Sequence, residues 1–263
     1  MVRRPERAPA PADADAKGTG RPARGRRALP LDGERGFPRR RQRRWKARVG
    51  EKLKRRSVTD PTAATIHTYD RVAREYHDKR YDRELAQERL DHIGILLGPG
   101  RHRILDLGCG PGYDAALIRA QGHCAIGADL SSGMLSFARR HYPGPYLRTD
   151  MRRLPFAAAF DAIWANASML HLEPTDFPGA LAECQRVLKA GGYLALSLKA
   201  GEGQAWENGR FAVEDAPRFF TYWTAADLDR ALAAAGFSSV GGATGDGTDE
   251  HQTWLSRLVQ KPH

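Results

Sequence analysis

The sequence predicts an α/β protein built on a mostly parallel sheet with crossover helices. From residue 103 onward, short apolar runs of strand length alternate with segments of helical periodicity. Strand, helix and strand in close succession are typical of a parallel sheet. Residues 57–263 also contain enough chain to bury one complete hydrophobic core. We therefore expect one α/β domain over residues 57–263.

Residues 1–56 form a basic leader whose composition differs from the rest. They carry 20 Lys and Arg against 6 Asp and Glu; subtraction from totals of 42 and 31 leaves 22 basic and 25 acidic residues for 57–263. Large apolar residues are scarce in the leader, so we expect it to be disordered. Its run Arg39 to Arg44 would attract nucleic acid. Its Arg, Pro, Ala and Gly bias equally fits a solvated tail, translated upstream DNA before a start near Val49 or Val58, or a transit peptide.

The apolar runs and the cysteines exclude several classes of protein. No run approaches the roughly 18 apolar residues of a membrane span, and no apolar block follows the Arg-rich start as in a secretory signal. We expect a cytoplasmic protein without membrane association, and the oligomeric state stays open. Cys109, Cys124 and Cys184 are odd in number and lack a C-x-x-C pair. They predict reduced thiols and no metal site.

Two helices are expected before the first strand. Asp60 and Pro61 suit a helix start, and apolar or aromatic residues then recur at helical spacing through Tyr76. A second helix is expected from Arg83 to Leu97. The elements predicted next are a strand at 104–107, a helix at 113–120, a strand at 125–128, a helix at 131–141, strands at 146–149 and 160–165, a helix at 177–189 and a strand at 193–198.

The C-terminal part predicts a helix and an antiparallel finish. Residues 200–222 read as a long connection with few helix or strand signals, and long ordered loops are often functional. Thr224 to Asp227 is a capping-box pattern that begins a helix ending at Gly236. Strands are expected at 238–242 and 253–259.

The segment from Ile104 to Asp114 places a glycine turn between a strand and a helix. Glycines there allow a close ligand approach and positive φ angles. The spacing is G-x-G-x-G, whereas a dinucleotide fingerprint needs G-x-G-x-x-G, and Tyr113 stands where its third glycine would be. Asp106 lies two residues before the first glycine, where its carboxylate suits a cationic amino group. Neither feature suits a diphosphate.

Two further carboxylates end the next strands. Asp129 follows 23 residues after Asp106, at a place where a carboxylate accepts hydrogen bonds from ribose hydroxyls. Asp150, followed by Met151, ends the third strand and suits an adenine amino group. Together the three positions describe a ligand that is both an amino acid and an adenosine, without phosphate.

Four segments in order, DLGCGPG, GADLSSGML, TDMRRLPF and FDAIWANASMLHL, resemble the successive motifs of class I S-adenosylmethionine (SAM)-dependent methyltransferases of the type 11/25 kind. The resemblance implies a Rossmann-like seven-stranded sheet in the order 3214576, with strand 7 antiparallel and helices on both faces. It implies SAM as the cofactor. Its contacts would be as follows: Asp106, Cys109 and the glycines Gly108, Gly110 and Gly112 beside the methionine part, Asp129 on the ribose, Leu130 and Met134 around the ring, Asp150 and Met151 on the adenine, and Asn166 and Ala167 along the pocket.

Single residues keep alternative interpretations. Asp114 is either a first-turn helix charge or a pocket contact, and Met134 is either core packing or a ring contact. Tyr69, in the helix before the first strand, is either a cofactor contact from a lid or a packing residue. His171 follows the fourth strand, where this family commonly faces its substrate. It is either a general base or a histidine bonded to the backbone.

Methyl transfer from a sulfonium is an in-line displacement that needs alignment and exclusion of water. The aromatic stretch 218–223 either walls an acceptor pocket, with Arg210 or Arg218 pairing an anionic acceptor, or plugs the edge of the sheet. A small-molecule acceptor is our first hypothesis. An RNA or protein methyltransferase using the leader, and a SAM-binding protein without methyl transfer, are the alternatives.

Overall fold

The computed structural model describes residues 60–80, 91, 94, 97–208, 211–213, 215–246 and 252–263. The chain divides into two units, Met1–Arg55 and Arg56–His263, and every described residue lies in the second. The predicted leader, most of the predicted helix at 83–97 and Arg210 lie outside the described residues. Within the described ranges, no helix is both long enough and apolar enough to cross a membrane.

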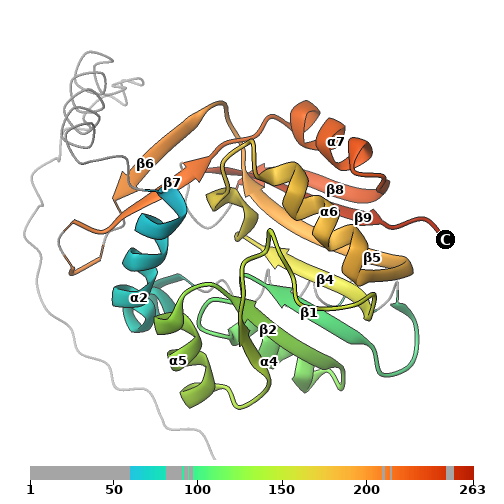
Figure 1. Ribbon diagram of the computed structural model, residues 1–263, viewed down its shortest axis with the longest axis horizontal. Helices are drawn as coiled ribbons and strands as arrows, with labels where there is room; N and C mark the ends of the chain where they lie inside the picture. The colour runs from blue at the N-terminus through green and yellow to red at the C-terminus, as the bar shows by residue number, and fades with distance from the viewer. Residues whose placement is uncertain are drawn as a thin grey trace, which may run out of the picture. The chain divides into compact units, whose positions relative to one another are not determined.

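Seven strands form the main sheet in the order β3-β2-β1-β4-β5-β9-β8 (Figure 1). The bounds are β1 Arg103–Leu107, β2 Cys124–Asp129, β3 Tyr146–Arg148, β4 Phe160–Asn166, β5 Leu188–Lys199, β8 Ser238–Asp246 and β9 Thr253–Gln260. The first five strands pair in parallel, and β9 is antiparallel to both β5 and β8. Strands β8 and β9 therefore take the places of strands 6 and 7 in the predicted order. The order 3214576 with strand 7 antiparallel is confirmed.

Helices cover both faces of this sheet (Figure 1). Leu105 and Leu107 of β1 belong to a buried cluster with α6 (Phe177–Val187) and α7 (Ala225–Ala234), whereas Ile104 belongs to a second cluster with α4 (Tyr113–Ala120). Alternate residues of a strand point to opposite faces. The central strands are therefore buried on both sides, which explains why their sequences read as nearly continuous apolar runs.

The helix starts follow from local capping. Ser131 precedes α5 (Ser132–His141), and its side chain accepts a hydrogen bond from the Met134 amide. Thr224 precedes α7 and accepts from the Asp227 amide, as the capping-box pattern predicts. The helix predicted at 177–189 ends at Val187, because β5 begins at Leu188.

The expectation of an irregular connection at 200–222 is wrong. Residues Gln204–Asn208 (β6) and Pro217–Thr221 (β7) form a two-stranded antiparallel sheet. The segment is rich in aromatic side chains, which favour strands, and Trp206 lies opposite Phe219 with ring centroids 5.6 Å apart. This hairpin packs beside α2 (Pro61–Arg80), as Figure 1 shows. It therefore stands next to the carboxyl ends of the central strands.

Candidate active site

A cavity of about 250 Å³ lies between the carboxyl ends of the central parallel strands and helix α2. In an open α/β sheet this edge is where ligands bind. The cavity brings together every predicted site residue except Gly112: Tyr69, Asp106, Gly108, Cys109, Gly110, Asp129, Leu130, Met134, Asp150, Met151, Asn166, Ala167 and His171. Asp114 also lines it, so its side chain faces the cavity as well as opening α4.

Asp106 is the least exposed acidic residue that lines the cavity. It is 2% exposed, and its Oδ2 is buried without a hydrogen-bond partner among the described residues. Burial, followed by the nearby carboxylate of Asp114, raises the pKa of Asp106 well above its usual value. A cationic amino group bound there would satisfy the oxygen and favour the ionised carboxylate. The site therefore fits the ammonium group of an amino-acid ligand.

The three glycines of the turn have different roles. Gly108 has a φ of 74°, and a Cβ on it would lie 2.2 Å from the Cβ of Ser168, so the turn packs against the residues after β4. Gly110 has a φ of 49° and open space where its Cβ would be. Gly112 is the residue before α4 and has a φ of 87°. A Cβ added to it would lie 2.6 Å from the Tyr146 hydroxyl. Gly112 thus packs against the protein and is not among the residues that line the cavity, and its contact with the cofactor stays a prediction.

Asp129 closes the turn from the next strand. Its Oδ2 accepts a hydrogen bond of 2.8 Å from the Gly110 amide, and its Oδ1 accepts one of 2.8 Å from the Ser131 amide. Burial raises the pKa of Asp129, while these donors act against the rise. An ionised carboxylate has about four acceptor positions, so capacity remains for a ligand hydroxyl.

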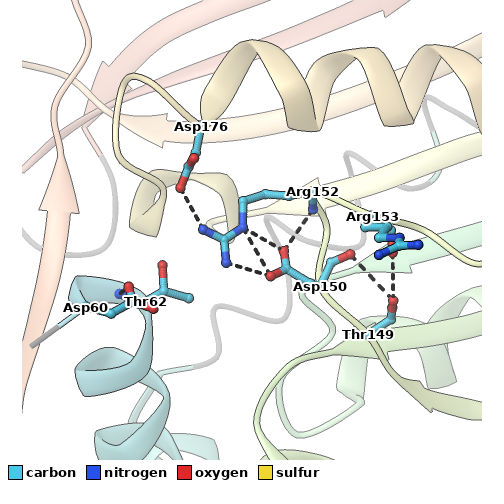
Figure 2. Close-up of polar contacts among 7 residues, drawn as sticks. All are labelled: Asp60, Thr62, Thr149, Asp150, Arg152, Arg153 and Asp176. Carbon is cyan, nitrogen blue, oxygen red and sulfur yellow. Dashed lines mark hydrogen bonds and ion pairs between the residues drawn. The ribbon is translucent and has the colours of Figure 1, made fainter.

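Asp150 is held by an arginine, as Figure 2 shows. Arg152 donates to both carboxylate oxygens, with distances of 2.6 Å from Nη2 to Oδ2 and 3.0 Å from Nε to Oδ1. The Arg152 amide adds a bond of 2.9 Å to Oδ1, and Nη1 reaches Asp176 at 2.7 Å. Although partial burial acts in the opposite sense, hydrogen bonds from Arg152 lower the pKa of Asp150. These hydrogen bonds from Arg152 occupy the acceptor positions of the Asp150 carboxylate, which we predicted would bind an adenine amino group.

The end of β4 places a strained backbone in the cavity wall. Ala167 has a φ of 50°, a left-handed backbone conformation that residues other than glycine rarely adopt. The Ala167 amide donates to Ser197 Oγ at 2.9 Å, and Ser197 donates to Asn166 Oδ1 at 2.6 Å. Such conformations persist where their surroundings fix them, often at functional sites.

His171 stands at the other end of the cavity, bonded on both ring nitrogens. Its Nδ1 lies 2.6 Å from the carbonyl oxygen of Phe219, which only accepts, so Nδ1 carries the proton. Its Nε2 lies 2.7 Å from Tyr69 Oη and accepts the phenol proton. Burial, together with the positive charges of Arg218 and Lys199, lowers the pKa of His171 to about 3. The ring is therefore a neutral acceptor that fixes the Tyr69 hydroxyl.

Two buried cations lie beside this end. Lys199 is 9% exposed and donates to Glu207 Oε2 at 2.7 Å. Arg218 is 4% exposed, and its Nη1 donates to Tyr69 Oη at 3.4 Å. Cations and tyrosine therefore surround the histidine that the sequence singled out.

Several cavity residues were not among the predicted ones. They share a position on α2, after β4, or on the late strands: Thr62, Thr65, Ile66, Tyr76, Ser168, Leu172, Ser197 and Trp254. The α2 residues recur at helical spacing, which the sequence shows, but which side of the helix faces a cavity depends on tertiary packing.

Comparisons with known proteins agree with this geometry. Residues 105–196 match the methyltransferase domain family. A malonyl-[acyl-carrier protein] O-methyltransferase of Enterobacter lignolyticus is 33% identical over 178 residues, which are 65% of this chain and 67% of the relative. The chain belongs to the family of SAM-dependent methyltransferases, whose cofactor is SAM.

Other relatives match a smaller share of their own length. A trans-aconitate 2-methyltransferase of Acidovorax ebreus is 32% identical over 123 residues, 46% of this chain and 47% of the relative. Across the first relatives, the chain spans about half to two thirds of their length.

Solved structures show the same fold. A 1,6-didemethyltoxoflavin-N1-methyltransferase of Burkholderia thailandensis, with bound S-adenosylhomocysteine, has a TM-score of 0.61 and 23% identity, covering 79% of this chain and 92% of that one. A SAM-dependent methyltransferase of Methanosarcina mazei has a TM-score of 0.58 and 17% identity, covering 63% and 95%.

Proposed function

We propose that the protein transfers the methyl group of SAM to a small-molecule acceptor by in-line displacement. One observation carries the proposal: a single cavity joins the acidic strand ends to the enclosed Tyr69 and His171 end. When bound, SAM supplies an activated methyl group. The chain's own residues then bind, orient and exclude water, and orientation can contribute several kcal/mol, about 7 to 11 in favourable intramolecular reactions.

The cofactor contacts are part of this proposal. Asp106 is assigned to the ammonium group because its Oδ2 is buried and lacks a donor among the described residues. Asp129 is assigned to the ribose because its carboxylate lines the cavity and keeps acceptor capacity after it binds Gly110 and Ser131. Asp150 and Met151 are assigned to the adenine end of the cavity. For Asp150, this contact requires that Arg152 share the carboxylate or move away.

The size of the cavity and the family relatives favour a small acceptor. Helix α2 and the residues after β4 line the cavity, so the acceptor end lies between packed elements. The relatives named above act, by their names, on a malonyl group on a carrier protein and on trans-aconitate. The alternative, an RNA or protein acceptor, would use the basic leader as an electrostatic tether.

The test is incubation of the full chain and SAM labelled in the methyl group with cell extract divided into metabolite, RNA and protein fractions. Label in the metabolite fraction, with S-adenosylhomocysteine as coproduct, is expected. Label confined to RNA or protein would refute the small-molecule assignment. Binding of SAM without transfer to any fraction would refute methyltransferase activity.

A further inference from the structure

Two buried carboxylates line the cavity on either side of the glycine turn. Asp106 lies near the end of β1 and is 2% exposed, and Asp114 lies in the first turn of α4 and is 6% exposed. After burial itself, the charge of Asp114 is the largest influence that raises the pKa of Asp106. Two like charges that act on each other in a buried place are costly to ionise together.

The carboxylate of Asp114 is supplied with hydrogen-bond donors by β4. Its Oδ2 accepts from Trp164 Nε1 at 2.7 Å and from Asn166 Nδ2 at 3.3 Å. The hydroxyl of Ser197 on β5 donates in turn to Asn166 Oδ1 at 2.6 Å. Donors of this kind favour the ionised form of a carboxylate. Asp114 is therefore held as a carboxylate by two strands, whereas a charge that served only the helix start would not need them.

Asp106 has fewer donors than its neighbours. The Ala115 amide donates to its carboxylate, but Oδ2 is buried and has no hydrogen-bond partner among the described residues. Asp129, by contrast, accepts one amide hydrogen bond on each oxygen. An ionised carboxylate that lacks donors pays the largest desolvation penalty. Of these three carboxylates, Asp106 is the one best suited to hold a proton in the ligand-free protein.

The other titratable and charged groups around Asp106 do not reverse this order. Asp129 on β2 adds a further negative charge, and Arg119 on α4 acts in the opposite sense. The Arg119 guanidinium donates to Tyr146 Oη on β3 at 2.7 Å, and neither residue lines the cavity. Burial raises the pKa of Tyr146 and, together with the nearby carboxylates, that of the Cys109 thiol, so both stay neutral. The two donors from β4 do not titrate.

Resting on the cofactor contacts of the function proposed above, we propose that Asp114 is a second carboxylate for the ammonium group of SAM, and that this group replaces a proton held at Asp106. The ammonium group enters with its charge, the O–H bond at Asp106 Oδ2 breaks, and the proton leaves to solvent. Asp106 then pairs with the ammonium group as a carboxylate. The buried site exchanges one positive charge for another, so both carboxylates are ionised when the cofactor is bound.

The sign of the pH dependence follows from linkage. Burial and the charge of Asp114 raise the pKa of Asp106 in the ligand-free protein, and a bound ammonium group would lower it. Between the two pKa values, binding releases up to one proton, and the dissociation constant falls by up to about tenfold per pH unit. Above the ligand-free pKa the affinity levels off. Between pH 5 and 7 the ligand's own α-amino group, whose ordinary pKa is near 8, stays charged.

The first test counts protons by calorimetry. Full-length protein is titrated with S-adenosylhomocysteine between pH 5 and 7 in buffers of different ionisation enthalpy. Release of more than about half a proton per ligand is expected at pH 5, and the analogue that lacks only the α-amino group should release none. Binding without proton release, or equal release by the two ligands, would overturn the exchange alone. Absence of binding by both SAM and S-adenosylhomocysteine would instead refute the function proposed above.

The second test uses two variants that keep the shape of the side chain. Asp106→Asn should bind S-adenosylhomocysteine more weakly than wild type at pH 7 and approach wild type at pH 5, because a protonated Asp106 is also neutral. Asp114→Asn keeps an oxygen for the Trp164 indole. It should weaken binding at pH 7 by about tenfold and release fewer protons at pH 5, because Asp106 loses the neighbouring charge. A merely structural role of Asp114 would not change the number of protons.

The matched control is Asp161→Asn on β4. The Asp161 carboxylate accepts from the Arg103 amide at 2.7 Å and from Lys189 Nζ at 2.6 Å, and Asp161 is not among the residues that line the cavity. This variant should leave the affinity and the proton count unchanged. An Asp114→Asn protein with wild-type affinity and proton release would overturn the assignment of Asp114. Equal changes in Asp114→Asn and Asp161→Asn would also overturn it.

Discussion

Replacement of His171 by asparagine removes one ionisable group from the acceptor end. The asparagine amide can still donate to the Phe219 carbonyl, as Nδ1 does at 2.6 Å. The pKa of His171 is lowered to about 3 by burial and by the charges of Arg218 and Lys199, whereas an unfolded histidine titrates near 6.5. The variant should therefore unfold with a different dependence on pH.

The sign and size of the difference follow from proton linkage. Between pH 6.5 and about 3, the unfolded chain binds a proton at His171 that the folded chain does not bind. The stabilisation from this group is therefore complete above pH 6.5 and is lost as the pH falls towards 3. The difference between the two pKa values corresponds to about 5 kcal/mol. His171 is half-buried and solvent screens part of this energy, so we expect about 2 to 5 kcal/mol.

The assay is urea unfolding at pH 4.5 to 7.5 for wild type and His171→Asn. Wild type should lose stability faster on acidification, by up to about 1.4 kcal/mol per pH unit, and the curves should converge towards low pH. Parallel curves would refute the reasoning. Because the pKa of His171 is lowered, we also expect a plot of kcat/KM against pH to show no loss of activity near pH 6 to 7 that is due to protonation of His171. A limb in wild type that disappears in His171→Asn would restore the general-base hypothesis.

Four further predictions concern the cofactor end. Asp129→Ala should weaken SAM binding about tenfold or more, through loss of a charge-assisted contact; unchanged calorimetric affinity would remove the ribose assignment. Gly110→Ala should weaken SAM binding about tenfold and cost only about 1 kcal/mol of stability from its φ of 49°, because its Cβ enters open space. Gly108→Ala should instead cost about 2 kcal/mol or more in urea unfolding, because its Cβ meets Ser168 at 2.2 Å; equal stabilities of the two variants would contradict this. Arg152→Met should free the Asp150 carboxylate and raise the preference for S-adenosylhomocysteine over its analogue lacking the 6-amino group by about tenfold; an unchanged calorimetric ratio would show that this carboxylate does not read the amino group.

The gathering of the acidic strand ends around one cavity could be predicted because its signals are local. The glycine turn follows a strand directly, and Asp106, Asp129 and Asp150 each stand at or just beyond the end of a neighbouring parallel strand. Once strand order is known, these positions converge at one edge of the sheet. The hydrogen bonds of Arg152 to Asp150 were not predicted, although only one residue lies between the two. The hydrophobic periodicity of a sequence does not distinguish an arginine that faces solvent from one whose side chain folds back onto a neighbouring carboxylate.

The acceptor half could not be predicted in the same way. Lys199, Glu207 and Arg218 meet because residues 200–222 fold into a hairpin that returns to the sheet edge. This pairing is not local, and aromatic density at 218–223 was the signal available for it. The sequence did offer Arg218 as a partner for an anion, but its burial, its register opposite Glu207 and its buried Nε without a hydrogen-bond partner among the described residues come from the fold.

The backbone of Phe219 shows that the two halves of the cavity are held in place by different contacts. The Phe219 amide donates to Thr65 Oγ1 on α2 at 3.0 Å, and its carbonyl accepts from His171 after β4 at 2.6 Å. A neighbouring bond of 2.7 Å joins Thr221 Oγ1 to the Leu172 carbonyl. Helix α2, the hairpin and the residues after β4 are thus tied to one another by hydrogen bonds on the acceptor side. The side with the acidic residues depends instead on strand ends fixed by the sheet, so changes in the hairpin can alter the Tyr69 and His171 end while the carboxylates assigned to SAM stay in place.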